Sequence, residues 1–148
     1  MKKVFAAAAL AALSTSPVQA EELFWNGTIK QVFEKQCSSC HGSGAPEYAA
    51  FKKDREGWIS KGAGMRMDTY SHLISFVGWP NTGALMRRLD DGSSSKEGKP
   101  GNMYRYLGAD EQERQANLTL FKHWVGSWNL KRWSDVSREE LDGIKARY

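Results

Sequence analysis

Residues 37–41 read Cys-Ser-Ser-Cys-His, and this stretch holds both cysteines of the 148-residue chain. On a helical turn, residues i and i+3 face the same side, so both thiols can reach the two vinyl groups of one porphyrin. His41 follows directly and can turn its imidazole onto the iron as the proximal axial ligand. Cys-x-x-Cys-His is the attachment pattern of a c-type haem. The sequence therefore predicts one haem c, bound covalently through Cys37 and Cys40.

Three other uses of a Cys-x-x-Cys pair fit the sequence less well. A thioredoxin-like dithiol sits in a βαβ context, and no strand pattern precedes Cys37. A zinc site needs further ligands at suitable spacing, and only the isolated His72 and His123 remain. A disulfide within the motif suits an oxidising compartment but leaves His41 without a role.

The first twenty residues have the pattern of an export signal. Lys2 and Lys3 precede an apolar run over residues 4–13, and Val18-Gln19-Ala20 gives a small-residue cleavage site. Ten apolar residues are about half of the ~20 that a transmembrane helix needs, which disfavours a membrane anchor. We predict cleavage after Ala20, a periplasmic location and no transmembrane span.

Composition narrows the class of protein. Removing residues 1–20 leaves 148 − 20 = 128 residues, and the formal net charge falls from +4 to +2 because two lysines leave with the signal. Six Trp, five Tyr and six Phe are enough to build a core, which excludes a disordered chain. Aromatic-interleaved basic clusters are absent, and we therefore exclude nucleic acid as a partner.

The segment that leads into the motif has helical spacing. Asn26 is its expected N-cap, and the i, i+3, i+4 pattern is followed by Ile29, Val32, Phe33 and Gln36. Residues 42–64, after the motif, are rich in Gly, Lys and Ala. We predict loops or short turns there that wrap the haem, with Phe51 and Trp58 as contacts of the ring.

The middle of the chain predicts two short helices and a loop. Asp68 is the expected cap of the first helix, which ends before Pro80 and has an apolar face of Tyr70, Leu73, Ile74 and Val77. The second helix covers residues 84–89. Residues 91–101 are rich in Ser, Lys and Gly and predict a surface loop.

The clearest helix begins at Asp110, where Glu113 completes a capping-box-like start. Its apolar stripe comprises Leu118, Phe121, Trp124, Val125 and Trp128. Ser137 predicts a further short helix that ends at about Arg147. No strand pattern is convincing, and we predict an all-α fold: a signal peptide over 1–20, a haem domain over 21–130 and a helical extension over 131–148.

The sixth position of the iron has several candidate ligands. Met103 lies in the Pro/Gly loop Lys99–Tyr104, where a methionine is free to approach the iron from the side opposite His41. Met67 and Met65 lie in a second loop and are its rivals. A helical methionine such as Met86 is more often core filler. His72 or His123 as the ligand would give a bis-histidine haem.

The chain resembles the class I c-type cytochromes, which are small monohaem electron carriers. The resemblance rests on Phe33 four residues before Cys37, on the Cys-x-x-Cys-His motif, on Pro100-Gly101-Asn102-Met103 and on an aromatic C-terminal helix. It implies a small helical fold wrapped around the haem, with His41 as proximal and Met103 as distal ligand. It also implies crossed terminal helices that bring Phe33 near Trp124 and Val125.

One position departs from this family. Ile29 stands where a glycine usually lets the two helices approach closely, and Gly27 is the available substitute.

These features predict an electron carrier and not an enzyme. A haem with two protein ligands leaves no open site for substrate, so single electrons pass through the exposed haem edge between redox proteins in the periplasm or at the membrane surface. The cations Lys96, Lys99, Arg105 and Lys122 are candidates for steering an acidic partner. Two alternatives remain open. One is a subunit of a periplasmic oxidoreductase that docks through 131–148, with Trp133 and Tyr148. The other is a binder of NO, CO or O2 with a weak sixth ligand.

Overall fold

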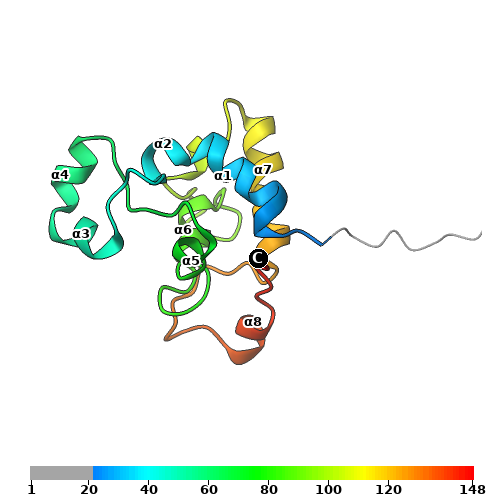
Figure 1. Cartoon of the computed structure of the whole chain (residues 1–148). Coiled ribbons are helices and arrows are strands. Elements are labelled where there is room, and N and C mark those ends of the chain that lie inside the picture. The colour runs from blue at the N-terminus through cyan, green and yellow to red at the C-terminus, as the bar shows by residue number, and fades with distance from the viewer. Residues whose placement is uncertain (1–21) are drawn as a thin grey trace, which may run out of the picture.

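The structure is a computed structural model that describes residues 22–148 (Figure 1). The predicted export signal lies outside these described residues. Within them the chain forms helices and loops, and its only strand-like pairing is a single bridge between Gly126 and Ile144. The all-α prediction is therefore confirmed.

The helices are short, and only one exceeds two turns. In chain order they are η1 (Trp25–Ile29), α1 (Lys30–Gln36), α2 (Ser38–His41), α3 (Tyr48–Lys53), α4 (Arg55–Ser60), α5 (Tyr70–Ile74), α6 (Ala84–Leu89), η2 (Tyr104–Tyr106), α7 (Glu111–Val125) and α8 (Arg138–Asp142).

The core is centred on the packing of η1 and α1 beside α7 (Figure 1). The ring of Trp25 lies 5.7 Å from that of Phe33 and 6.1 Å from that of Trp124, so Phe33 reaches Trp124 through Trp25. Ile29 is fully buried within the same cluster. A Cβ atom at Gly27 would meet nothing within 4 Å, so Gly27 does not provide the close helix approach.

Two predicted caps are wrong. η1 starts before Asn26 and has Phe24 at its N-cap position, so Asn26 lies inside the helix, which Gly27 interrupts with non-helical dihedral angles. Thr69 caps α5, because its hydroxyl accepts a hydrogen bond from the His72 backbone N–H. The Asp68 carboxylate accepts instead from the Arg66 guanidinium.

Residues 42–64 differ from the prediction. We predicted loops or short turns, whereas the segment contains the two helices α3 and α4. The Asp54 carboxylate caps α4 by accepting a hydrogen bond from the Gly57 N–H. The two helices project from the domain, with α2 between them and α7 (Figure 1). Phe51 is the one buried residue of α3 and α4, so the sequence has no apolar stripe from which these helices could be predicted.

The second half of the chain largely follows the prediction. α6 and the loop over 91–101 are confirmed. α7 begins after its Asp110 cap and buries Leu118, Phe121, Trp124 and Val125, whereas Trp128 lies beyond its end. α8 has the Ser137 capping box but ends at Asp142 instead of at about Arg147. Residues 145–148 form no helix, and Ala146 has a φ of 33°.

These final residues complete the core. The Ala146 N–H donates to the Trp124 carbonyl, and the Arg147 carbonyl accepts from both the Trp124 Nε1–H and the Trp25 backbone N–H, each at 2.8 Å. The Tyr70 hydroxyl donates to the Ala146 carbonyl at 2.9 Å. The end of the chain therefore links α7 to η1 and α5.

Removing residues 144–148 tests this role. The deletion leaves the buried N–H groups of Trp25 and Trp124 without acceptors, and each such loss costs about 1–3 kcal/mol. We expect the free energy of unfolding to fall by at least about 3 kcal/mol, measured by chemical denaturation with tryptophan fluorescence. Deleting Tyr148 alone keeps a carbonyl oxygen on Arg147 and should cost less than about 1 kcal/mol. Equal stability of the two truncated proteins would contradict the assignment.

Candidate haem site

The Cys-x-x-Cys-His motif forms one helical turn at the junction of α1 and α2. The His41 N–H donates to the Cys37 carbonyl at 2.9 Å, which closes the turn. The two cysteines form no disulfide with each other; Cys37 is half-buried and Cys40 is exposed. Burial, with a smaller contribution from Cys40, raises the pKa of Cys37 to about 12. A redox-active dithiol needs a lowered thiol pKa, so this environment disfavours the thioredoxin-like alternative.

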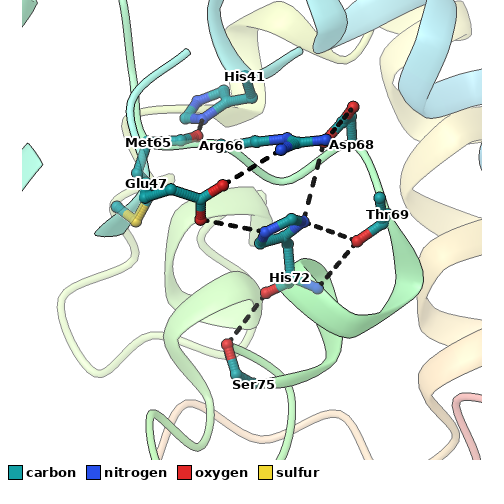
Figure 2. Close-up of polar contacts among 8 residues, drawn as sticks. All are labelled: His41, Glu47, Met65, Arg66, Asp68, Thr69, His72 and Ser75. Atoms are coloured by element: carbon teal, nitrogen blue, oxygen red, sulfur yellow. Dashed lines mark hydrogen bonds and ion pairs between the residues drawn. The ribbon is translucent and has the colours of Figure 1, made fainter. Parts of the chain in front are cut away.

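His41 is held in one orientation by a backbone acceptor. Its Nδ1 lies 2.7 Å from the carbonyl oxygen of Met65 (Figure 2). Because a carbonyl only accepts, Nδ1 must be the protonated nitrogen. Nε2 of the neutral ring then keeps its lone pair for a metal, and a hydrogen bond of this kind fixes both the tautomer and the ring plane of a ligating histidine.

The segment 64–67 is fastened against the motif. The Gly64 N–H donates to the Cys40 carbonyl at 2.8 Å, and the Met67 N–H donates to the His41 carbonyl at 2.9 Å. A Cβ atom at Gly64 would overlap the His41 imidazole. Glycine is therefore required at position 64, where the backbone passes directly beneath the ring.

The methionines lie on three separate parts of the domain. Met65 and Met67 belong to the segment that holds His41. Met86 is fully buried in the apolar core. Met103 is half-buried, packs against that core and donates its N–H to the Arg88 carbonyl at the end of α6.

The loop that ends at Met103 is anchored by a buried carboxylate. Asp90 is 1% exposed and accepts hydrogen bonds from the Trp128 indole at 2.9 Å and from the backbone N–H groups of Gly92 and Ser94. Burial alone would raise the pKa of Asp90, but these hydrogen bonds outweigh it and lower the pKa overall. The Asp90 carbonyl also accepts from the Gly101 N–H, which closes the loop two residues before Met103.

The residues around the motif fit a covalently bound haem. Cys37 and Cys40 lie three residues apart in one helical turn, which is the spacing that the two vinyl groups of a haem need. His41 offers Nε2 to an iron. Across residues 22–148, no group of three His, Cys, Asp or Glu side chains lies together as a metal site would require. None of the helices between those residues is long and apolar enough to cross a bilayer.

Sequence reasoning missed the residues that position the candidate ligands His41 and Met103. Gly64 and the Met65 carbonyl orient His41, yet a backbone acceptor leaves no side-chain signature. The Gly62-Ala63-Gly64 run was the available signal, because closely spaced glycines indicate a close backbone approach. Asp90 gave none, since a buried aspartate in a polar loop looks like any surface residue.

Comparison with known proteins defines the class. The chain matches the family described as "PccH Cytochrome c" over residues 24–148. It is also 58% identical to the solved monohaem cytochrome PccH from Geobacter sulfurreducens, with a TM-score of 0.80, over 86% of this chain and 100% of that one. None of the curated proteins matches.

The fold and the site thus define a monohaem c-type cytochrome, with one covalently bound haem c and the task of carrying electrons. Within that class, the chain belongs to the PccH cytochrome c family.

Replacing Gly64 tests the contact with His41. In Gly64→Ala the new methyl group overlaps the imidazole, and overpacking of this kind costs about 1–3 kcal/mol. We expect a smaller low-spin fraction of ferric haem in the visible spectrum and a lower stability of the holoprotein. Gly44→Ala is the matched control, because a Cβ atom there meets nothing within 4 Å. Identical spectra and stabilities for the two variants would show that position 64 tolerates a side chain.

Asp90→Asn tests the loop anchor. The amide lacks the charge and one acceptor oxygen, so we expect a loss of about 1–3 kcal/mol in unfolding free energy at neutral pH. Because the folded-state pKa of Asp90 is lowered, its contribution is present above its unfolded value of about 3.9 and is lost as the pH falls through the folded value. The deficit should therefore shrink in acid. The exposed Asp142→Asn is the control and should change stability by less than about 0.5 kcal/mol. A deficit that does not depend on pH would rule out the charge as its source.

Proposed function

We propose that the protein is a periplasmic electron carrier whose haem iron is ligated by His41 and Met103 and which exchanges electrons with redox proteins by outer-sphere transfer. The observation that supports this most directly is the 2.7 Å hydrogen bond from His41 Nδ1 to the Met65 carbonyl, which leaves Nε2 for the iron. The family supplies the haem, and a haem with two protein ligands provides one-electron chemistry without an open coordination site.

Met103 is favoured over Met65 and Met67 because of its position in the chain. Segment 64–67 is bonded to the proximal motif through Cys40 and His41, so its residues approach from the His41 side. Met103 belongs to a different loop, fixed to the end of α6 by the Arg88 and Asp90 carbonyls. A ligand from an independent, anchored loop is what a second axial position requires.

The export pattern of residues 1–20 supports the periplasmic location. Steering by surface cations has weaker support, because Lys99 pairs with Glu97, Lys122 pairs with Asp91, and Arg105 stacks on the Tyr106 ring.

The alternative roles have distinct requirements. A subunit that docks through 131–148 would have to leave Ala146 and Arg147 in place, because their backbone groups are bonded within the domain. Trp133 and Tyr148 are both exposed and available for such contact. A binder of NO, CO or O2 would need a weak or absent sixth ligand, whereas the bonds that anchor the loop favour a firmly held Met103.

Met103→Ala tests the ligand assignment. A thioether favours the ferrous state, so we expect loss of the far-red sulfur-to-iron charge-transfer band. We also expect a fall in midpoint potential of at least about 59 mV, a factor of ten for one electron. Met67→Ala and Met65→Ala should keep the band, since Met65→Ala retains the backbone carbonyl. Loss of the band in Met67→Ala alone would transfer the role to Met67. A native spectrum of open, high-spin iron that takes up CO readily would refute the carrier.

A further inference from the structure

A cluster of charged side chains surrounds His72 immediately beside the segment that holds His41 (Figure 2). Glu47, at the N-cap of α3, lies 3.1 Å from His72 Nε2. The Thr69 hydroxyl lies 2.6 Å from His72 Nδ1, and Asp68 Oδ1 lies 3.8 Å from the same nitrogen. Arg66 bridges the two carboxylates, at 2.7 Å from Asp68 and 3.2 Å from Glu47.

We propose that His72 binds a proton when the haem is reduced, so that the protein takes up a proton together with each electron. The inference rests on His41 being an axial ligand, as proposed above. One electron enters at the haem from the redox partner. One proton leaves a hydronium ion of the solvent, so that an O–H bond of the hydronium breaks, a water molecule is left, and an N–H bond forms at His72 Nδ1.

The hydrogen bonds around His72 fit both protonation states. In the neutral ring, Nε2–H donates to Glu47 while Nδ1 accepts from the Thr69 hydroxyl. After protonation, Nδ1–H donates and the same hydroxyl accepts, because a threonine oxygen can do either. No atom of the ring loses its partner, so the proton can bind without rearrangement of the backbone. The side chain is 29% exposed, which gives water access to it.

The charges of the cluster favour the added proton. Glu47 and Asp68 contribute −2 and Arg66 contributes +1, so the cluster has a net charge of −1 with neutral His72 and of zero with protonated His72. The hydrogen bond from Arg66 lowers the pKa of Asp68, which keeps that carboxylate charged. From the other elements nearby, Lys30 and Tyr148 border a depression shared with Asp68 and Thr69, and Lys30 pairs with Glu34.

The cluster is connected to His41 through the peptide group between Met65 and Arg66. Arg66 follows Met65, whose carbonyl accepts from His41 Nδ1, and the Arg66 N–H donates to the Pro46 carbonyl beside Glu47. Reduction removes one positive charge from the iron, and this favours a cation nearby. By linkage, a proton that binds more tightly to the reduced protein makes reduction easier at low pH.

The direct test follows the histidine ring protons of the wild-type holoprotein by NMR, in the ferric and in the ferrous state, between about pH 5 and pH 8, where histidine commonly titrates. We expect the titration midpoint of His72 to lie higher in the ferrous protein by at least half a pH unit, which is about threefold in proton affinity. His123 is exposed on α7 and should titrate alike in both states. Equal midpoints for His72 in the two states would overturn the proposal.

Spectroelectrochemistry provides the second readout. The midpoint potential of the wild type should fall as the pH rises through this range, and His72→Gln, which can still donate to Glu47, should flatten the profile. His123→Gln should behave as the wild type. A pH dependence that persists in His72→Gln belongs to another group, such as a haem propionate, and overturns the proposal. The far-red methionine band in each sample reports separately whether the proposed axial ligation holds.

Discussion

The hydrogen bond between His41 Nδ1 and the Met65 carbonyl is the constraint around which the haem side of the domain is organised. For the carbonyl to reach the ring, segment 64–67 must run back along the motif, which the bonds from Gly64 to Cys40 and from Met67 to His41 achieve. That path requires glycine at position 64. It also brings the two ends of residues 46–63 together, so that α3 and α4 form a loop that leaves the domain and returns to it at the same place. The orientation of one imidazole thus sets the course of a much longer stretch of chain.

An element could be predicted from the sequence where side chains stabilise it, and could not be predicted where backbone atoms do. Cys37, Cys40 and His41 were predictable because covalent chemistry fixes their spacing, and α7 was predictable because one face holds Leu118, Phe121, Trp124 and Val125. α3 and α4 bury only Phe51 between them, so their sequence shows no helical periodicity of apolar residues. Met65, Ala146 and Arg147 act through backbone atoms, which any residue supplies. Axial ligation by Met103 stays a prediction.

Two polar clusters anchor the segment that holds His41 and the loop of Met103 by different means. On the His41 side, Arg66 and its carboxylate partners lie beside His72 within reach of water. On the Met103 side, Asp90 is sealed from solvent and satisfied by Trp128, Gly92 and Ser94. A buried, fully bonded carboxylate favours a rigid loop, whereas a half-exposed charged cluster favours exchange of protons.

The closing hydrogen bonds at Ala146 and Arg147 also bear on the order in which contacts can form during folding. The Trp25 N–H and the Trp124 indole both donate to the Arg147 carbonyl, so the bond to Trp25 joins segments that are far apart in the sequence. The Cys-x-x-Cys-His turn is closed by a bond between His41 and Cys37 within the same turn. Because contacts between distant segments cost more loop-closure entropy than local ones, we expect the turn that presents the cysteines to form before the contacts that complete the core.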